Sequence, residues 1–259
     1  MDACYGWPMP ETVVHCVAAK GVATITLDSP ANRNALSRGL VADLHAALDR
    51  AEQSDVRVIV LTHTGTTFCA GADLKERLAG PVDSSPMVRA FRRLMDASQP
   101  SIAALHGVAR AGGVGLMASC DLVVVQPSAD FAFTEVRIGA APAIISIPIL
   151  RRCAAAQVAA AFLTGEIFGA SRAREIGLVS HVAEDVDAAV AELTAALLSG
   201  APIALAATKA ILHTVPGEPV DSAFARMQRL SESLFEGEEA SEGMRAFIDK
   251  RAPSWTRQR

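Results

Sequence analysis

Three glycines stand at the head of a segment that otherwise has the pattern of a helix, in the stretch HGVARAGGVGLMASCD at 106–121. Gly112, Gly113 and Gly115 each cost about 1 kcal/mol relative to alanine inside a helix. Because glycine has no Cβ, another group can come closer to its backbone than to that of any other residue. The sequence therefore indicates that the peptide groups themselves are needed at this point.

The composition is that of a globular protein with a large core. The chain has 259 residues, of which 51% are hydrophobic and 20% charged, so we expect one main domain with an appended part. The formal net charge of −4 and the lack of long basic runs argue against nucleic acid as a partner. The five cysteines are scattered and form no C-x-x-C pair, which argues against a disulfide framework and against a metal site.

No segment has the sequence pattern of a membrane span or of a secretion signal. The stretch MDACYGWPMPETVV at the start lacks a basic region followed by an apolar one. The longest apolar run, IGAAPAIISIPIL, is too short to cross a bilayer and contains two prolines. We therefore expect a soluble, cytoplasmic protein with no membrane partner.

The order of the apolar patterns predicts an α/β fold. Two β-rich runs around Lys20–Gly21 predict a hairpin, leucines at every fourth position predict a helix over 37–53, and the apolar run at 56–62 predicts a strand covered on both faces. The strands that follow come in pairs for each helix, unlike the alternation of a doubly wound sheet. We expect an α/β core over 1–195 and a helical C-terminal region over 196–259. From residue 144 onward the predicted helices cover 144–163, 171–177, 187–199, 202–214, 220–236 and 239–251.

Two loops could place backbone N–H groups around one oxygen atom. The first amides of a helix over 112–120 have no acceptor within the helix. The loop FCAGAD at 68–73 also has small residues before a helix, which Asp73 is placed to cap. Two such sets of amides at neighbouring strand ends would form an oxyanion hole, although a tight turn or close packing would use the same glycines. The spacing is neither the G-x-G-x-x-G of a dinucleotide site nor a P-loop.

Six segments, taken together in their order and spacing, resemble a known protein family. They are NAL at 34–36, FCAGADLKE at 68–76, AGGVGLMASCDLVV at 111–124, FTEVRIG at 133–139, LTGEIFGASRAREIGLVSHV at 163–182 and EGMRAFIDKR at 242–251. Over nearly its whole length the chain resembles the enoyl-CoA hydratase/isomerase (crotonase) superfamily. The resemblance implies a crotonase-like spiral of ββα units with a C-terminal helical region, and subunits that associate as homotrimers or homohexamers. It also implies an acyl-CoA substrate and no cofactor beyond the coenzyme A of that substrate.

The resemblance further implies which residues hold the substrate. The thioester oxygen of an acyl-CoA would accept hydrogen bonds from the amides of Ala72 and Gly112, which would explain the glycines. Other residues of the same two loops would contact the CoA arm and the acyl part, and residues of the terminal helix would reach a ligand, often one held by a neighbouring subunit. The loop residues are Ala70, Asp73, Leu74, Gly113 and Gly115, and those of the terminal helix are Phe247 and Lys250.

The sequence departs from the family pattern in its carboxylates. Family hydratases carry two glutamates, of which the later falls on Glu135 here, while the earlier position is Gly115. A carboxyl group beside an acyl chain in an apolar pocket is expected to have a raised pKa and to exchange protons near neutral pH. We therefore expect Glu135 to be the catalytic acid and base.

With one carboxylate, three functions stay open. Hydration of a 2-enoyl-CoA usually positions water between two carboxylates, whereas moving a double bond from position 3 to position 2 needs only one. The segment TEVRIGAAPAIIS at 134–146 resembles hydratases of branched or methylglutaconyl-type enoyl-CoA, a branch in which a glycine can replace the earlier glutamate. We predict an enoyl-CoA hydratase, with an enoyl-CoA isomerase as the first alternative and a non-catalytic acyl-CoA-binding protein as the second.

Overall fold

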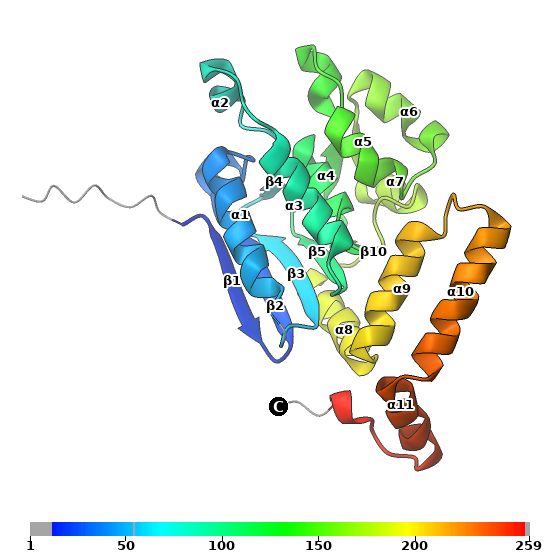
Figure 1. Cartoon of the computed structure of the whole chain (residues 1–259). Helices are drawn as coiled ribbons and strands as arrows, with labels where there is room; N and C mark the ends of the chain where they lie inside the picture. Colours follow the sequence, from blue (N-terminus) through cyan, green and yellow to red (C-terminus); the bar gives the residue numbers. More distant parts are fainter. Residues whose placement is uncertain (1–11, 54, 257–259) are drawn as a thin grey trace, which may run out of the picture.

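The strands form two sheets, which the chain visits in turn (Figure 1). The computed structural model describes residues 12–53 and 55–256. In the six-stranded sheet the order is β1-β2-β3-β5-β7-β10, and in the four-stranded sheet it is β4-β6-β8-β9. The larger sheet contains β1 (Val14–Ala19), β2 (Val22–Leu27), β3 (Val58–His63), β5 (Ser101–Leu105), β7 (Leu122–Val125) and β10 (His181–Val182). The smaller sheet contains β4 (Thr67–Cys69), β6 (Val108–Arg110), β8 (Asp130–Ala132) and β9 (Ile167–Gly169).

Successive turns of the chain stack as a spiral because equivalent strands pair in parallel. In the larger sheet β3 pairs with β5 and β5 with β7, while in the smaller sheet β4 pairs with β6 and β6 with β8. From β3 to β8, each pair of consecutive strands has one strand in each sheet and is followed by a helical segment. The predicted α/β class, with a spiral of ββα units and helices at the C-terminal end, is therefore confirmed.

The predicted hairpin at the start of the spiral is also confirmed. β1 and β2 pair antiparallel, with Ala19 opposite Val22. The two residues between them, Lys20 and Gly21, have φ of 52° and 76°. Two positive φ angles in a two-residue turn match the right-handed twist of the flanking strands.

Most predicted helices are present with ends shifted by a few residues, but the one over 144–163 is wrong as a single helix. It forms two helices with a break at 151–154, where Ala154 is extended and Arg152 donates to the carbonyls of Cys120 and Asp121. The break therefore depends on a contact with a distant part of the chain.

The α-helices are α1 (Arg38–Ala51), α2 (Leu74–Ala79), α3 (Ser85–Asp96), α4 (Gly112–Ala118), α5 (Ala143–Leu150), α6 (Ala155–Thr164), α7 (Ala170–Glu175), α8 (Val186–Ser199), α9 (Pro202–Thr214), α10 (Val220–Phe235) and α11 (Glu238–Ile248). The 3-10 helices are η1 (Pro30–Asn32), η2 (Thr134–Ile138) and η3 (Ser254–Thr256).

The larger sheet is a middle layer between α1 and α8. Ile59 and Leu61 of β3 belong to the main core, together with the apolar face of α1. Val58 and Val60 point to the opposite face of the strand, where they pack in a second cluster with residues of α8. Since all four side chains are buried, β3 is covered on both faces, as its unbroken apolar sequence predicted.

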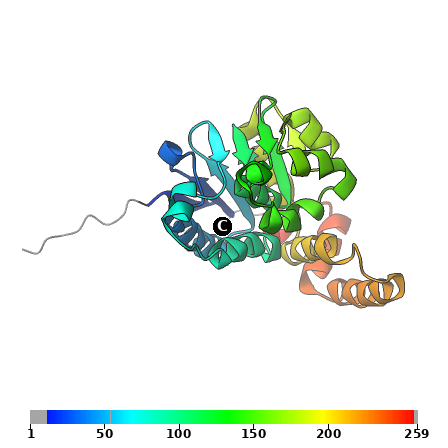
Figure 2. The same cartoon turned by 90° about the horizontal axis from the view of Figure 1, so that it is seen from above.

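The helices after α8 extend to one side of the spiral (Figures 1 and 2). α9 packs against the spiral, and α10 and α11 contact each other beyond it. Among the described helices none is by itself long and apolar enough to cross a membrane, and the α8–α9 pair that passes this test together is bent by 112°.

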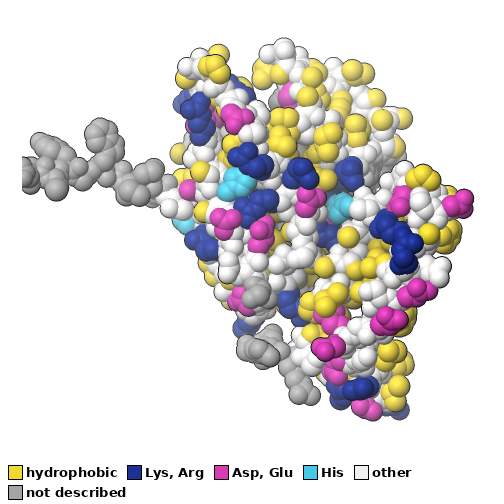
Figure 3. Space-filling view, in the orientation of Figure 1, with side chains coloured by type: hydrophobic (Ala, Val, Ile, Leu, Met, Phe, Trp, Pro, Cys, Tyr) yellow, Lys and Arg dark blue, Asp and Glu magenta, His cyan; other side chains and the backbone are white. Residues whose placement is uncertain are grey.

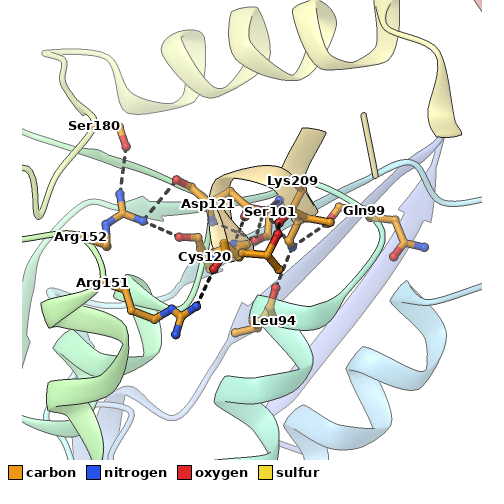
Figure 4. A network of polar contacts seen from close by, with 12 residues as sticks. Leu94, Gln99, Ser101, Cys120, Asp121, Arg151, Arg152, Ser180 and Lys209 are labelled. Atoms are coloured by element: carbon orange, nitrogen blue, oxygen red, sulfur yellow. Dashed lines mark hydrogen bonds and ion pairs between the residues drawn. The ribbon is translucent and has the colours of Figure 1, made fainter. Parts of the chain in front are cut away.

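A buried ion pair fastens α9 to the spiral (Figure 4). Lys209 is 5% exposed, and its Nζ lies 2.9 Å from Oδ2 of Asp121, the residue before β7. The same ammonium group donates to the carbonyls of Leu94 and Gln99 at 2.8 and 3.0 Å. Oδ2 of Asp121 also accepts from the amide of Ser101 at 2.7 Å. The pair therefore joins α9, α3 and the larger sheet.

Replacing Lys209 with methionine would leave the Asp121 carboxylate buried without its main counter-charge. Burial alone would raise the pKa of Asp121, but a hydrogen bond from His213 and the charge of Lys209 hold it below its ordinary value. A lowered pKa means that this carboxylate stabilises the fold at neutral pH, and that the contribution is lost as the pH falls through the folded-state pKa. We expect Lys209→Met to lower the free energy of unfolding by about 3 kcal/mol at neutral pH. Urea unfolding followed by circular dichroism measures this change. Adding Asp121→Asn should recover part of the loss, and an undiminished loss in the double variant would contradict the ion-pair explanation.

Candidate active site

Three segments of the chain begin at one edge of the smaller sheet. The strands β4, β6 and β8 are parallel neighbours, so their carboxyl ends lie on the same side. Ligands of open α/β sheets bind beyond such strand ends. We call the residues that follow these strands the first segment (70–74), the second segment (111–115) and the third segment (133–138). They contain every predicted site residue except Phe247 and Lys250.

The first and second segments meet through their backbones. A Cβ on Gly112 would lie 3.5 Å from the Cα of Gly71 and 3.6 Å from the nitrogen of Ala72, and a Cβ on Gly71 would lie 3.2 Å from the nitrogen of Gly112. A Cβ on Gly113 would overlap the carbonyl oxygen of Cys69 at 2.3 Å. Gly71 also has a φ of +91°, which side chains rarely allow. The glycines therefore permit a contact between peptide groups that larger residues would prevent.

Two N–H groups at this contact have no acceptor among the described residues. Leu36 pairs with Ala72 through its own amide, which donates to the carbonyl of Gly71 at 2.7 Å and leaves the Ala72 amide unused. Gly112 is the first residue of α4, so its amide has no acceptor within the helix. Elsewhere in residues 12–53 and 55–256 it donates to no other group. Two unused donors on adjacent segments could bind one oxygen atom from two directions.

Ala111 joins β6 to α4 in a strained backbone conformation. Its φ of 46° and ψ of −120° belong to a turn position that glycine usually occupies. Its amide donates to the carbonyl of Ala132 at the end of β8, and its carbonyl accepts from the amide of Val114, both at 2.9 Å. Nothing in the sequence marks an alanine for a positive φ, so this conformation could not be predicted from the sequence. The strain lies directly before the unused amide of Gly112.

Asn34 is fully buried and holds the chain beside the first segment. Its Nδ2 donates to the carbonyls of Thr64 and Thr67 at 3.1 and 2.8 Å, and its Oδ1 accepts from the amide of Ser29 at 2.7 Å. Because Leu36, two residues later, pairs with the first segment, this side chain helps to position that segment. In the sequence, Asn34 is only the first residue of the family segment NAL. The one local sign that its side chain is buried is that two apolar residues follow it directly.

Glu135 lies in the third segment with a carboxyl group that the protein does not fully bind. Its Oε2 is buried and has no hydrogen-bond partner in the part of the chain that the structure describes. Burial raises the pKa of Glu135 above its ordinary value, against a smaller opposite effect of a hydrogen bond from its own amide. This direction agrees with the expectation from the sequence. A carboxyl of this kind can exchange protons near neutral pH.

Apolar side chains occupy the place of the second glutamate. A Cβ on Gly115 would lie 2.5 Å from Cγ2 and 2.9 Å from Cβ of Ile145 in α5, and 3.0 Å from the ring of Phe91 in α3. A glutamate at this position would have to displace both side chains. The remaining carboxylate of the three segments, on Asp73, accepts from two amides of α2. Glu135 is therefore the one carboxylate of these segments that has a buried oxygen without a partner.

The other predicted residues lie in two separate places. The amide of Ala70 donates to a carbonyl before α1 at 3.0 Å, Asp73 caps α2 as predicted, and Leu74 begins that helix with 52% of its surface exposed. Phe247 is 86% exposed on α11, and Lys250 follows that helix, at the opposite end of the molecule from α2 (Figure 1). One chain thus brings together the three segments but not the terminal helix.

Two hollows in the surface lie away from the three segments. One of about 650 Å³ is lined by polar side chains of α1 and α3, among them His45, Arg89 and Arg93. Another, of about 910 Å³, lies between the hairpin turn at Lys20 and the C-terminal Trp255. We place the candidate site at the strand ends instead, because the unused amides and the unpartnered carboxyl are there. Within the described ranges no group of three His, Cys, Asp or Glu side chains is arranged to hold a metal ion.

Known proteins match this chain over most of its length. Residues 18–258 match the family described as "Enoyl-CoA hydratase/isomerase". A Thermus thermophilus protein named "Putative enoyl-CoA hydratase" is 36% identical over 246 residues, which are 90% of this chain and 96% of that protein. A crystal structure of an enoyl-CoA hydratase from Mycobacterium smegmatis is 30% identical, with a TM-score of 0.89 over 95% of this chain and 100% of that chain. One from Mycobacterium avium is 44% identical, with a TM-score of 0.72 over 95% of this chain and 99% of that chain.

The strain at Ala111 predicts that glycine at this position stabilises the protein. With alanine, the strained conformation costs on the order of 1–3 kcal/mol. Glycine avoids this strain, but it lowers the stability by about 0.5–1 kcal/mol because it makes the unfolded chain more flexible. We expect Ala111→Gly to raise the free energy of unfolding by about 1 kcal/mol and the melting temperature by about 2 °C, measured by calorimetry. Ala109→Gly in β6, whose φ is not positive, is the matched control and should lower both values. A lower melting temperature for Ala111→Gly would show that no strain is relieved.

Proposed function

The chain belongs to the enoyl-CoA hydratase/isomerase family, and from that premise we propose that it is an enzyme that adds water to the double bond of a 2-enoyl-CoA. One observation carries the proposal. The unpartnered carboxyl of Glu135 and the unused amides of Ala72 and Gly112 follow three adjacent parallel strands. Such a set supports proton transfer beside a carbonyl group whose oxygen gains negative charge.

In the proposed reaction the thioester oxygen accepts hydrogen bonds from Ala72 and Gly112. The carboxylate of Glu135 takes a proton from a water molecule while the water oxygen bonds to C3. The electron pair of the double bond moves toward the thioester, whose oxygen carries the enolate charge. Glu135 then returns a proton to C2, which gives the 3-hydroxyacyl-CoA and restores the carboxylate. These steps need no cofactor beyond the coenzyme A of the substrate.

The proposal divides the chain into a core that binds and reacts and a C-terminal region that assembles. We assign acyl-CoA binding and catalysis to residues 1–195, and oligomerisation and cover of the site to residues 196–259. Residues of the first and second segments would contact the substrate, and residues near the end of α11 would reach a substrate held by a neighbouring subunit. The proposed contact residues are Ala70, Asp73, Leu74, Gly113 and Gly115 in the core, and Phe247 and Lys250 in the C-terminal region.

Isomerisation of a 3-enoyl-CoA is the second candidate, and the surroundings of Gly115 favour it. Ile145 and Phe91 form an apolar wall where a second carboxylate would hold water. A single base such as Glu135 can take a proton from C2 and return it at C4, which moves the double bond without water. Hydration with one carboxylate, in contrast, leaves the water with fewer partners. The two reactions share the same enolate and differ in the substrate that is turned over.

The central test replaces Glu135 with glutamine, which keeps the size of the side chain but cannot exchange the proton. We expect kcat to fall by about 10²–10⁴ while the affinity for an acyl-CoA changes little. Assays of the wild type should use crotonyl-CoA, a long 2-enoyl-CoA, methylglutaconyl-CoA and a 3-enoyl-CoA. Hydration of any 2-enoyl-CoA supports the first candidate. Turnover of the 3-enoyl-CoA alone supports the second and contradicts the first.

A matched control and a stability measurement complete this test. Glu166→Gln removes an exposed carboxylate and should leave kcat unchanged. Because burial raises the pKa of Glu135, its charged form destabilises the fold once the pH exceeds the folded-state pKa. Glu135→Gln should therefore melt at a higher temperature than the wild type at neutral pH, and the difference should vanish below about pH 4. Binding of acyl-CoA with no turnover of any substrate by the wild type would mean that the chain is a binder and not an enzyme.

A neighbouring subunit would cover apolar side chains that this chain exposes. Figure 3 shows hydrophobic side chains on the surface of the C-terminal helices and around α5 and α6. Phe224, Phe247 and Ile248 are 73%, 86% and 76% exposed, and Leu163 on α6 is 78% exposed. Large apolar patches of this kind usually mark interfaces. We propose a homotrimer or homohexamer and expect light scattering at micromolar concentration to give about three or six times the mass of the chain. A monomer mass would contradict the proposal.

A further inference from the structure

His63 is a buried histidine whose two ring nitrogens both bind the backbone. It ends β3 and is 8% exposed. Its Nε2 accepts from the amide of His106 at 3.0 Å, and its Nδ1 lies 3.2 Å from the carbonyl oxygen of Thr64. Since an amide N–H only donates and a carbonyl oxygen only accepts, the ring is neutral and carries its proton on Nδ1. The ring packs edge-on against Phe68, with centroids 5.6 Å apart.

These two bonds join two links of the chain that lead to the candidate site. The first link, residues 64–66, connects β3 to β4 and so to the first segment. The second link, residues 106–107, connects β5 to β6 and so to the second segment. The links are in close contact, because a Cβ on Gly107 would overlap the carbonyl oxygen of Thr66 at 2.0 Å. A shift of one link would therefore be felt by the other.

Asn34 extends the path from His63 to the first segment. The Thr64 carbonyl that binds His63 also accepts from Nδ2 of Asn34 at 3.1 Å. Leu36, two residues after Asn34, pairs with the first segment. The path therefore runs from the amide of His106 in the second link through His63, the Thr64 carbonyl and Asn34 to the first segment, and every step is a hydrogen bond or the chain itself.

We propose that neutral His63 is a positioning residue that holds the amides of Ala72 and Gly112 in register, which here means that both can donate to one oxygen atom. Protonation of its Nε2 releases this register. The proposal rests on the proposed function. A proton on Nε2 would face the N–H of His106, which leaves two donors opposed and a charge buried. The contact between the two links would open. The amides act on the transition state, so the loss would fall on kcat more than on KM.

The charged groups around His63 lie on several elements. The ring of His106 is 5.9 Å away, and its Nε2 binds Asp187 in the first turn of α8 at 3.0 Å. On the side of β2, Asp28 accepts at 2.6 Å from the hydroxyl of the residue after His63 and pairs with His15 at 3.3 Å. The carboxylates of Asp187 and Asp28 therefore contact neighbours of His63 and not His63 itself. The histidine ring that lies beside it is that of His106.

The neutral state of His63 is also the one that its surroundings favour. Burial lowers the pKa of His63, the bond to the Thr64 carbonyl opposes this effect, and the charge of His106 lowers the pKa further. A lowered histidine pKa means that the contribution of the neutral ring is present above the ordinary value of about 6.5 and is lost as the pH falls through the folded-state pKa. Release of the register therefore requires a pH below the ordinary histidine value.

The first test is the slope of log kcat against pH on the acid side. Glu135 must lose its proton and His63 must be neutral, so the wild-type slope should approach about two. His63→Gln keeps an oxygen that can accept from the amide of His106 but takes up no proton. We expect its slope to fall to about one, with kcat within about threefold of the wild type at about pH 8 and KM unchanged. His45→Gln on α1 is the matched control and should keep the wild-type slope. An unchanged slope in His63→Gln would overturn the proposal.

The second test needs no turnover. In protein labelled with ¹⁵N, the ring of His63, identified by its loss in His63→Gln, should show a protonated Nδ1 and a bare Nε2 at neutral pH. As the pH falls, the amide signals of Ala72 and Gly112 should move with the same midpoint as that ring, and in His63→Gln they should no longer do so. The opposite tautomer, or amide signals that ignore the titration of His63, would overturn the proposal. If these signals behave as expected while no enoyl-CoA is turned over, the positioning role stands and the proposed function fails.

Discussion

The contact between the peptide groups of 71–72 and 111–112 is the constraint on which the rest of the site depends. Two parallel strands, β4 and β6, bring the segments together, and glycines leave no Cβ between them. The arrangement costs free energy, because glycine weakens α4 and Ala111 holds a strained backbone. Buried hydrogen bonds offset that cost, above all those of Asn34, and they fix the first segment from the side of α1.

In the proposed function, backbone amides at this contact bind the thioester oxygen, so that side chains have only to transfer protons. We assign that task to Glu135, which reaches the same edge of the smaller sheet because β8 is the next parallel strand. Burial both raises its pKa and deprives one of its oxygens of partners. Across from Gly115, the side chains of Ile145 and Phe91 exclude a second carboxylate. Both proposed reactions fit this arrangement, because each needs only one acid and base beside a polarised carbonyl.

Local features of the sequence predicted much of the fold. The hairpin at Lys20–Gly21, the amphipathic helix α1 and the doubly covered strand β3 each depend on a pattern within about fifteen residues, and all three are present. The glycine-headed helix was predicted for the same reason. The break at 151–154 was missed because its four residues include no glycine or proline to mark the end of a helix. What accompanies the break is a bond from the guanidinium group of Arg152 to the distant carbonyls of Cys120 and Asp121.

The details of the site were harder to predict from the sequence than the fold, because they depend on residues far apart in the chain. The sequence pointed to the loops and, through a family resemblance, to Glu135. It could not show that Ile145, thirty residues after Gly115, occupies the space beside it. Nor could it show that His63 and Asn34 share one carbonyl oxygen, since each is an ordinary polar residue until the fold places it.

The most direct measurement of the central claim is a crystal structure of the Glu135→Gln variant with a 2-enoyl-CoA bound, since the slowed reaction should preserve the substrate. We expect the thioester oxygen to lie about 2.7–3.1 Å from the backbone nitrogens of both Ala72 and Gly112. We also expect the side chain of residue 135 to lie beside C2 and C3 of the acyl group. A bound substrate whose thioester oxygen contacts neither nitrogen would contradict the central claim.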